Sequence, residues 1–483
     1  MSDLPTGWAE ATLDQLRAPE ANAITDGPYG SNLKTSHYRS SGARVIRLGN
    51  IGVREFSDID VVYISRDHFN ALSKHQVLAG DILVAALGDP IGRACLVPSN
   101  LGLSLVKADC FRVRPSRRLS AAFLMLWLNS DDTRAAFSSS SHGLGRIRIN
   151  LSDLRGTVVP VPPYPEQRRI VAKIDSLSAK SKRAIEHLDH IPELLEKYKQ
   201  AILAAGFQGE LTFEWRTKHL KTATVDHYTS DIDPRQSTLG KLPANWKWQA
   251  VSDVMRVTGG LTKNPKRSAL VTRRSYLRVA NVYANELRLA EVSEMGCTEG
   301  EFEKTKLLPG DLLIVEGNGS IEQIGRVAIW DDEIKECSHQ NHIIRARPSE
   351  IVEPRYVLYW LLSPLGREAI EAVASSSSGL HTLSITKVGK LRIPICSKSE
   401  QREIVRLIEN AFVWIERLAA ETTQARSLIG HLDQTVLVKA FRGELVPQDP
   451  NDEPASVLLE QIKVAREAEP KKKHQRALRV TAK

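Results

Sequence analysis

Cysteine and long apolar runs are both scarce in this chain of 483 residues. The five cysteines contain no CxxC pair, which argues against a disulfide framework or a zinc site; they are Cys95, Cys110, Cys297, Cys337 and Cys396. The longest apolar run, Ala121 to Leu128, is far shorter than the ~20 residues that cross a bilayer. The N-terminus has neither the apolar core nor the cleavage site of a signal peptide. We therefore expect a cytoplasmic protein without membrane association.

Enzyme signatures are present only in incomplete form. Val161 to Tyr164 (VPPY) is similar to the loop of amino methyltransferases, but valine cannot accept the hydrogen bond that the first position must accept. Asp311 to Glu316 is similar to the start of a nuclease Asp…Glu-x-Lys site, yet Asn318 stands where lysine is needed. No GxxxxGK(S/T) phosphate loop occurs, and His339 and His342 have no third metal ligand nearby. We expect no catalysis by this chain and no metal or cofactor bound to it.

What the chain does contain is a duplication, with an offset of 230 to 238 residues. The matching pairs are Leu4-Pro5 with Leu242-Pro243, Gly80-Asp81 with Gly310-Asp311, Ile91-Gly92-Arg93 with Ile324-Gly325-Arg326, Arg114-Pro115-Ser116 with Arg347-Pro348-Ser349, and Phe207-x-Gly209-Glu210-Leu211 with Phe441-x-Gly443-Glu444-Leu445. The period is far longer than that of a solenoid. Each copy consists of short strand patterns, such as Asp81 to Ala85, and one apolar helix pattern. The duplication predicts two α+β globular domains.

A long helical segment follows each predicted domain. Apolar residues step by four and three from Ile170, and again from Ile404 in the same register, which indicates a coiled-coil seam. The predicted seam residues are Ile170, Ile174, Leu177, Leu188, Ile191, Leu195, Tyr198, Ile404, Ile408, Ile415, Leu418, Ile429 and Leu432. Ser181 and Thr422 interrupt the seam, and Pro192 and Gly430 predict a kink or a weak point. The alternative is that each helix lies separately on its own domain.

The predicted architecture is a pseudo-two-fold repeat in which the two domains alternate with two long helices paired as an antiparallel coiled coil. The expected boundaries are 1–160 for the first domain, 161–215 for the first helical spacer, 216–240 for a linker, 241–395 for the second domain, 396–447 for the second spacer and 448–483 for a polar basic tail. A chain with two similar but non-identical halves suits a ligand with two similar but non-identical ends.

Polar loops offer the remaining functional chemistry. The net charge of +9 permits nucleic-acid binding, although much of it lies in the tail. Small residues in these loops let the backbone approach phosphates, while Arg, Lys and Asn can reach phosphates or base edges. The alternative is that such loops are plain connections. The candidate DNA-contacting residues are Tyr29, Ser31, Asn32, Lys34, His142, Arg146, Arg148, Lys263, Asn264, Lys266, Arg267, His342, His381 and Thr382.

The order of these features resembles one family, the specificity subunits of type I restriction–modification systems. Each helix opens at a Glu-Gln-Arg-x-Ile-Val stretch, Glu166 to Val171 and Glu400 to Val405, and ends at a Phe-x-Gly-Glu-Leu stretch. Asn341 to Arg345 (NHIIR) and Leu78 to Asp81 (LAGD) also match the family. The resemblance covers about residues 1–447. Pro192 and the degenerate entry at Pro394-Ile395-Cys396 depart from the family pattern.

The resemblance implies that each domain is a target recognition domain for one half of a bipartite, asymmetric DNA sequence, and that the helices fix the gap. It implies docking of two modification subunits that methylate adenine and of restriction subunits, with S-adenosylmethionine, ATP and Mg on those partners. The whole complex would defend the cell against foreign DNA. Three rival hypotheses remain: a DNA-bridging protein without sequence preference, a self-contained methyltransferase with diverged motifs, and a purely protein-binding scaffold.

Overall fold

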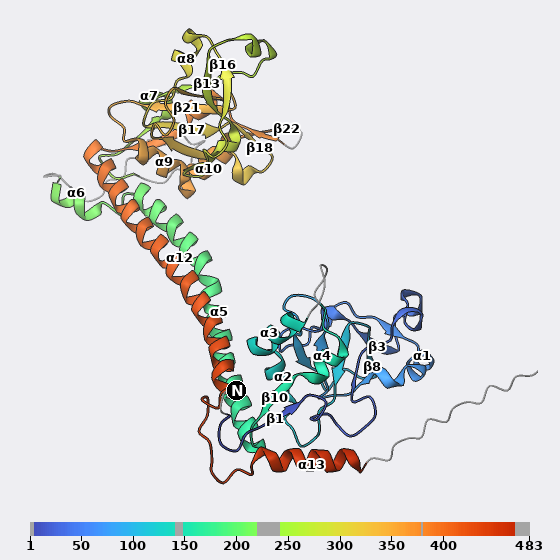
Figure 1. Ribbon diagram of the computed structural model, residues 1–483. Helices are drawn as coiled ribbons and strands as arrows, with labels where there is room; N and C mark the ends of the chain where they lie inside the picture. Colours follow the sequence, from blue (N-terminus) through green and yellow to red (C-terminus); the bar gives the residue numbers. More distant parts are fainter. Residues whose placement is uncertain (1–3, 141–147, 220–241, 378–379, 469–483) are drawn as a thin grey trace, which may run out of the picture. The chain divides into compact units, whose positions relative to one another are not determined.

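The computed structural model describes residues 4–140, 148–219, 242–377 and 380–468. The chain divides into two compact units: unit 1 contains residues 1–188 with 424–483, and unit 2 contains residues 189–423. Each unit therefore consists of one globular part together with one stretch of each of two long helices (Figure 1). The mixed helix and strand content and the duplicated arrangement confirm the predicted fold class.

The two long helices are α5 (Tyr164–Phe207) and α12 (Lys398–Phe441). Proline fits the first turn of a helix because its missing N–H has no intrahelical partner there, and Pro165 is the second residue of α5. Both helices continue without interruption, α5 through Pro192 and α12 through Gly430. Within the described residues, no helix combines the length and the apolar content that a membrane crossing requires.

In unit 2 the stretches of α5 and α12 run antiparallel. The rings of Tyr198 and Trp414 meet edge to face with centroids 6.2 Å apart. Further along α5, Gly206 leaves only 3.5 Å between the position of an added Cβ and Cγ2 of Ile404. The residue number thus rises along one helix as it falls along the other. Tyr198 is 46% exposed, so this predicted seam residue lies at the margin of the helix pair.

In unit 1 a polar contact joins the same two helices. Ser181, the polar residue in the predicted seam, is buried, and its hydroxyl donates to Oδ1 of Asp433 at 2.9 Å. The hydrogen bond satisfies a group that would otherwise be costly to bury. Leu432 next to this aspartate is 51% exposed and lies outside the covered stripe, whereas Ile170 and Ile174 are fully buried.

The globular part of unit 1 contains two four-stranded sheets, ordered β2-β9-β6-β7 and β4-β3-β8-β5, and the two-stranded pair β1-β10. Its strands are β1 (Ala9–Thr12), β2 (Ile24–Thr25), β3 (Ala43–Ile46), β4 (Tyr63–Ile64), β5 (Gln76–Val77), β6 (Ile82–Ala85), β7 (Ala94–Leu96), β8 (Ser104–Val106), β9 (Cys110–Val113) and β10 (Val158–Val161). Its helices are α1 (Arg66–Ala71), α2 (Ala121–Leu128), α3 (Asp131–Ser140), α4 (Leu151–Gly156) and α13 (Ala455–Glu467).

The globular part of unit 2 repeats this plan. Sheet β12-β21-β17-β19 corresponds to β2-β9-β6-β7, sheet β16-β13-β20 to β4-β3-β8, and pair β11-β24 to β1-β10. Its strands are β11 (Lys247–Ala250), β12 (Met255–Thr258), β13 (Arg273–Leu277), β14 (Val282–Tyr283), β15 (Glu286–Leu287), β16 (Ser293–Gly296), β17 (Asp311–Val315), β18 (Gly317–Asn318), β19 (Val327–Trp330), β20 (Cys337–His339), β21 (Ile343–Pro348), β22 (Ser375–Ser377), β23 (Leu380–Thr382) and β24 (Arg392–Ile395). Its helices are α6 (Phe213–His219), α7 (Val251–Val254), α8 (Glu299–Thr305), α9 (Pro354–Leu362), α10 (Pro364–Val373) and α11 (Ile385–Lys390).

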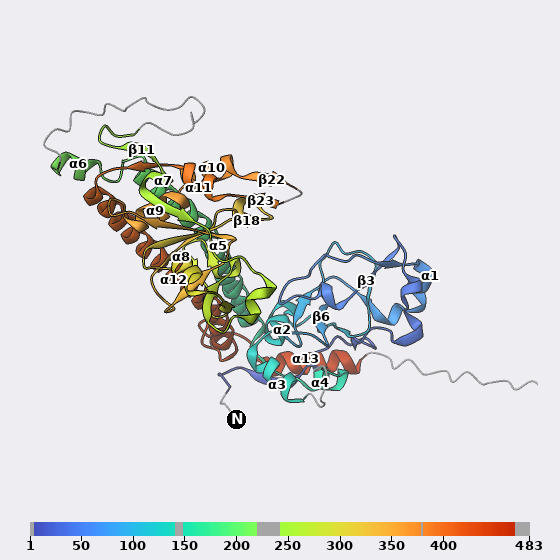
Figure 2. The same ribbon diagram turned by 90° about the horizontal axis from the view of Figure 1, so that it is seen from above.

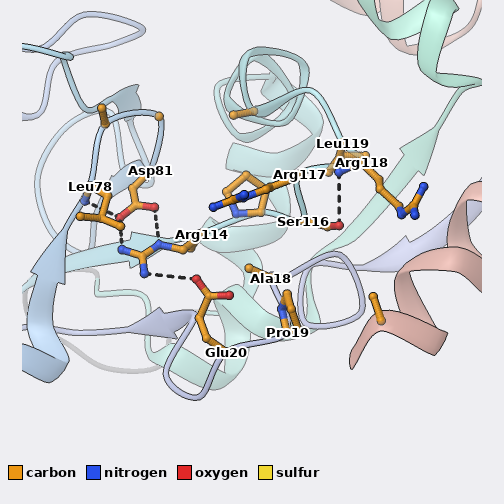
Figure 3. A pocket seen from close by; sticks show the side chains of 15 residues that line it. Ala18, Pro19, Glu20, Leu78, Asp81, Arg114, Ser116, Arg117, Arg118 and Leu119 are labelled. Carbon is orange, nitrogen blue, oxygen red and sulfur yellow. Dashed lines mark hydrogen bonds and ion pairs between the residues drawn. The ribbon is translucent and has the colours of Figure 1, made fainter. Parts of the chain in front are cut away.

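The repeated Gly-Asp turns begin β6 and β17, as the sequence predicts. In unit 1 the carboxylate of Asp81 accepts the Leu78 N–H at 2.8 Å and pairs with Arg114 at 2.7 Å, on the wall of a pocket of about 600 Å³ (Figure 3). In unit 2 Asp311 makes the same bidentate pair with Arg347, at 2.7 and 2.8 Å. Because both aspartates are buried, these pairs fix the turn and the neighbouring strand rather than bind a ligand.

The core of each unit is completed by both long helices. In unit 1, Phe441 at the end of α12 packs edge to face on Trp127 of α2, with ring centroids 4.9 Å apart. In unit 2, Phe207 at the end of α5 packs on Tyr356 of α9 at 5.1 Å. The start of the other helix belongs to the same apolar cluster in each case, through Ile170 in unit 1 and Ile404 in unit 2.

The glycines after these phenylalanines allow a close approach to a proline. Gly209 and Gly443 have φ of +79° and +72°, and a β-carbon on either would lie 2.5 Å from Cγ of Pro243 or Pro5, respectively. No side chain fits there, so glycine is required on steric and conformational grounds. The chain's N-terminal segment thus meets the end of α12 as residue 243 meets the end of α5. Helix α13 lies along the globular part of unit 1 in both ribbon views (Figure 2) and packs against β1. Within the segment expected to be a polar basic tail, Ala455, Leu458 and Ile462 thus belong to the core of unit 1.

The glutamates of the two Glu-Gln-Arg stretches are buried with different partners. Oε1 of Glu400 accepts hydrogen bonds at 2.8 Å from Nη1 of Arg216 and from the hydroxyl of Thr212. In unit 1, Oε2 of Glu166 accepts the indole N–H of Trp8 at 3.1 Å. The buried glutamate of unit 2 therefore forms an ion pair, whereas the buried glutamate of unit 1 accepts a hydrogen bond from a neutral donor.

This difference predicts unequal costs of removing the two glutamates. Glu400→Ala is expected to lower the free energy of unfolding by about 3–5 kcal/mol, because it leaves the buried Arg216 charged and unpaired. Glu166→Ala, the matched control, removes only a bond from a neutral donor and should cost about 1–3 kcal/mol. Urea unfolding of the full chain measures both. Equal losses of the free energy of unfolding would show that the buried ion pair stabilises the fold no more than the hydrogen bond from a neutral donor.

Candidate nucleic-acid interface

Backbone hydrogen bonds place three positions of unit 1 and three of unit 2 in equivalent settings. The Ala86 N–H donates to the Asp109 carbonyl at 2.9 Å, and the Ile149 N–H donates to the Ala86 carbonyl at 3.0 Å. In unit 2 the Glu316 N–H donates to the His342 carbonyl at 2.9 Å, and the Leu383 N–H to the Glu316 carbonyl at 2.7 Å. Positions 86, 109 and 148 therefore correspond to 316, 342 and 382.

In unit 1 this setting brings two of the predicted loops together. Nη1 of Arg148 lies 2.8 Å from Oδ1 of Asp109, and Nη2 donates to the Tyr29 hydroxyl at 2.5 Å. Burial and the neighbouring Asp26 raise the pKa of the Tyr29 hydroxyl, which remains a neutral phenol. Asp109 also borders a pocket of about 240 Å³ that Arg47 and Lys107 line. The result is a polar surface on which Arg47 and Arg148 each lie beside an aspartate, Asp60 and Asp109 respectively.

Other residues predicted for unit 1 have mixed placements. Ser31, Asn32 and Lys34 are exposed beside Tyr29. The Asn32 carbonyl lies 2.8 Å from Nε2 of His68, which anchors the loop. His142 and Arg146 lie outside the described residues.

In unit 2 the equivalent setting surrounds a carboxylate. Nδ1 of His342 lies 2.9 Å from Oε2 of Glu316, and both residues border the short sheet β18-β23-β22. His381 and Thr382 of β23 pair with Asn318 and Gly317 of β18. Three predicted residues, His342, His381 and Thr382, are thus gathered at one place around Glu316, which sequence reasoning had set aside with the incomplete nuclease signature.

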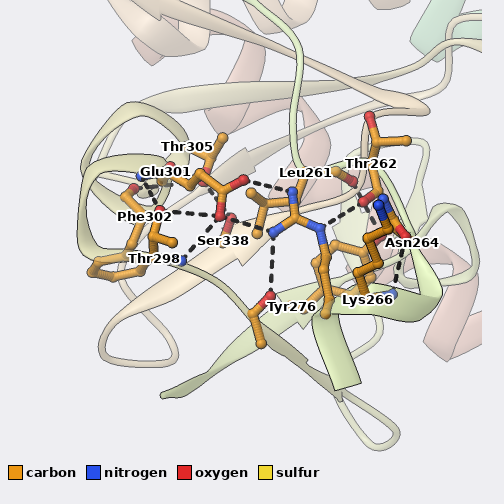
Figure 4. A network of polar contacts seen from close by, with 12 residues as sticks. Leu261, Thr262, Asn264, Lys266, Tyr276, Thr298, Glu301, Phe302, Thr305 and Ser338 are labelled. Carbon is orange, nitrogen blue, oxygen red and sulfur yellow. Dashed lines mark hydrogen bonds and ion pairs between the residues drawn. The ribbon is translucent and has the colours of Figure 1, made fainter. Parts of the chain in front are cut away.

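The other predicted loop of unit 2 contains an arginine whose side chain makes hydrogen bonds within the fold. Arg267 holds Glu301 with two hydrogen bonds of 2.9 and 3.0 Å and donates to the Thr262 carbonyl at 2.8 Å (Figure 4). The Arg267 guanidinium, with the Thr298 N–H, lowers the pKa of Glu301 to about 2. The exposed side chains of this loop are Lys263, Asn264 and Lys266, of which Asn264 caps the Lys266 N–H at 3.0 Å.

Sequence reasoning did not identify one arginine that occurs at equivalent positions in the two units. Oδ1 of Asn50 accepts the Arg47 N–H at 2.9 Å, and Oδ1 of Asn281 accepts the Arg278 N–H at 2.8 Å. The Nδ2 group of each asparagine donates to two further carbonyls, so the two turns have the same construction. The signal was present as Arg-x-x-Asn in both copies, at Arg47 to Asn50 and Arg278 to Asn281.

The described residues offer little support for a metal site or a reactive thiol. No group of three or more His, Cys, Asp or Glu side chains there lies close enough to hold a metal ion. All five cysteines are free and buried. Burial raises the pKa of Cys95, Cys110 and Cys337 to about 12, which keeps them as neutral thiols.

Sequence comparison decides the family. The pattern of the type I restriction modification DNA specificity domain matches residues 50–196 and 243–421, once in each half of the duplication. The chain belongs to the type I restriction–modification specificity family. The resemblance drawn from the helix entries and exits is confirmed, and DNA recognition in a type I restriction–modification system is the role of the chain.

Relatives of this specificity protein match it along nearly their whole length. The type I restriction enzyme EcoKI specificity subunit of Escherichia coli K12 is 27% identical over 98% of both chains. The StySPI specificity subunit of Salmonella potsdam is 26% identical over 96% of both. Among solved structures, the HsdS subunit from Thermoanaerobacter tengcongensis shares the fold, with a TM-score of 0.59 at 19% identity, over 92% of this chain and 98% of that one.

His339 lies at the end of β20 and gives unit 2 a dependence on pH. Burial lowers its pKa to about 4, whereas an unfolded histidine titrates near ~6.5. Between these values unfolding takes up a proton, so stability falls as the pH drops from about 6.5 toward 4. Unit 1 has Val106 at the equivalent position, since Val106 and His339 pair with Ile46 and Leu277 in the same parallel register.

His339→Val is therefore expected to remove part of the acid sensitivity of the chain. Its free energy of unfolding should fall less between pH 7 and pH 5 than that of the unsubstituted protein, because no buried histidine remains to resist protonation. Urea unfolding at the two pH values gives the comparison. If the free energy of unfolding falls by the same amount between the two pH values in the variant, His339 is not a source of the acid sensitivity.

Proposed function

We propose that each unit recognises one half of a bipartite, asymmetric DNA target, and that α5 and α12 together fix the gap between the halves. The carrying observation is that the two units share one backbone frame but differ in the side chains around its exposed polar surface, where Asp109 and Arg148 of unit 1 correspond to His342 and Thr382 of unit 2. Similar frames suit the common geometry of duplex DNA, and different side chains suit different base sequences.

The helices support a role as a spacer. Each of them has 44 residues. At ~1.5 Å per residue a helix of this length spans about 66 Å, or roughly two turns of duplex, which is an upper limit on the reach. Recognition sites ~34 Å apart, one turn of duplex, would present the same groove to both units.

We further propose that the chain is not itself catalytic and that it docks two modification subunits on its helices. S-adenosylmethionine, ATP and Mg then belong to the modification and restriction subunits of the complex, which together restrict foreign DNA. A solved structure titled for complex assembly of the type I R-M system has the same fold, with a TM-score of 0.56 at 17% identity, over 92% of this chain and all of that one.

Exposed apolar pairs on the helices support such docking. Leu194 and Tyr198 in α5 lie one turn apart and are 59% and 46% exposed. Leu428 and Leu432 in α12 lie 234 residues later, in the same register, and are 60% and 51% exposed. Exposed apolar surface of this kind indicates a protein contact. One equivalent pair in each unit fits two copies of one partner.

Exchange of the globular part of unit 1 tests the division of labour. Because β1 pairs with β10, residues 9–161 begin and end side by side and can be replaced as a block by those of a related specificity subunit. We expect one half of the methylated motif to change and the other half to remain. The measurement is single-molecule sequencing of genomic DNA from cells that express the chain with its modification subunits.

The exchange experiment and two further measurements distinguish the alternatives. A change in both halves, or in neither, would contradict the proposal. A bridging protein would bind duplex without sequence preference, whereas specific recognition should exceed random duplex by at least about a thousandfold. A self-contained methyltransferase would methylate DNA as the isolated chain.

Negative charge introduced at the two exposed apolar residues of α5 tests the docking of the modification subunits. Leu194→Glu combined with Tyr198→Glu is expected to reduce the bound modification subunits from two to one, because a buried carboxylate would have to be desolvated at that contact. Native mass spectrometry of the reconstituted complex counts them. Val271→Glu, at a loop residue that is 97% exposed, is the control and should leave two bound. Two subunits bound to the double variant would contradict the proposed surface.

A further inference from the structure

The duplication provides a comparison within one molecule. A partly exposed side chain that is kept in both units, unlike the buried aspartates of the turns, suits what the two half-sites have in common, which is the phosphate backbone. A side chain that differs at an equivalent position, on an exposed part of the same frame, serves what the half-sites do not share, which is base sequence.

Arg47 and Arg278 belong to the common set. Both stand at the start of a turn that a buried asparagine holds by its amide, with N–H to Oδ1 distances of 2.9 and 2.8 Å. Arg47 lines the same pocket as Asp109 in unit 1, next to the polar surface formed by Arg148. The Nη2 group of Arg47 also lies 3.5 Å from Oδ2 of the exposed Asp60. The position of Arg47 beside a variable surface, and its repetition in unit 2, suit a contact to phosphate.

Positions 86, 109 and 148 of unit 1 belong to the variable set. They carry Ala, Asp and Arg, where the equivalent positions 316, 342 and 382 of unit 2 carry Glu, His and Thr. Ala86 is buried in the core of unit 1, whereas the side chain of Glu316 is partly exposed, so only unit 2 presents a functional group from this position. The charged groups at this surface therefore differ: unit 1 has Arg148 paired with Asp109, and unit 2 has Glu316 beside His342. Unit 1 presents a guanidinium, whereas unit 2 presents a carboxylate.

Arg148 has the geometry of a fixed donor. Asp109 holds Nη1 at 2.8 Å, Tyr29 accepts from Nη2 at 2.5 Å, and the guanidinium carbon lies 5.6 Å from the centre of the Tyr29 ring. Each terminal nitrogen of a guanidinium has a second N–H, so two donors remain. Such a pair matches the O6 and N7 acceptors of guanine in the major groove.

Glu316 has the complementary chemistry. Its Oε2 is held by Nδ1 of His342 at 2.9 Å, and its backbone is fixed from both sides by β23 and by the His342 carbonyl. A carboxylate accepts about four hydrogen bonds in all, so the group can accept one from an exocyclic amine. In the major groove the N4 amine of cytosine is the donor that carboxylates recognise.

We propose, on the basis of the function proposed above, that these equivalent positions determine base specificity. Arg148 contacts the guanine of a G·C pair in the half-site of unit 1, and Glu316 contacts the cytosine of a G·C pair in the half-site of unit 2. Asp109 with Tyr29, and His342, are positioning residues that orient the two reading groups.

The test maps the methylated motif in cells that express the full chain with its modification subunits. Arg148→Gln should lower the preference for guanine at one position of one half-site by about tenfold or more and favour adenine there, since Gln pairs with adenine. Glu316→Gln should lower the preference for cytosine at one position of the other half-site by a similar factor. The unaltered half of each motif reports that the complex has folded and assembled.

Arg47→Gln and Arg278→Gln are the matched controls. Each should weaken binding to specific and random duplex by the same factor and leave the motif unchanged, because phosphate carries no sequence information. A changed motif in either control would overturn the division into common and variable contacts.

The outcomes separate the two proposals. If the unsubstituted complex yields no bipartite motif, the function proposed above is wrong. If it yields one, and Arg148→Gln and Glu316→Gln both leave it intact or alter the opposite half, only the assignment of the reading groups is wrong.

Discussion

The packing of both long helices into each globular core is the constraint on which the rest of the structure depends. Phe441 reaches Trp127 from the end of one helix, while Ile170 enters the same core from the start of the other. Phe207 and Ile404 do the same for unit 2. A core shared in this way cannot form before residues hundreds of positions apart have met. The helices are therefore structural parts of both units and not tethers between independent domains.

This sharing explains why the end of the chain returns to its beginning. Unit 2 is built from one continuous stretch, whereas the core of unit 1 is completed by residues between Val436 and Ile462. Gly443 against Pro5 repeats the contact of Gly209 against Pro243, and both require a residue without a side chain. Without that closure, unit 1 would expose the apolar side of α2, whose residues Phe123 to Leu128 are all buried.

Sequence reasoning predicted those parts of the fold that depend on local pattern. The seam from Ile170 and the Gly-Asp turns follow from periodicity and turn chemistry, which act over a few residues. Strand partners were beyond it, because pairing such as β3 with β8 is decided by long-range packing. The same limit applies to the site. Nothing local shows that Arg148 meets Tyr29 across 119 residues, or that Arg267 is committed to Glu301.

The division between frame and surface has an energetic consequence for how such a protein changes specificity. Buried frame groups such as Asp311 and Glu400 are tied to charged partners, so their replacement costs several kcal/mol (about 3–5) and endangers folding. Exposed groups such as Arg148 and His342 form polar pairs at the surface, and such pairs usually contribute only about 0–1 kcal/mol to stability. Two copies of one frame can therefore diverge at their reading positions while both remain folded, which is the condition for one chain to carry two different readers.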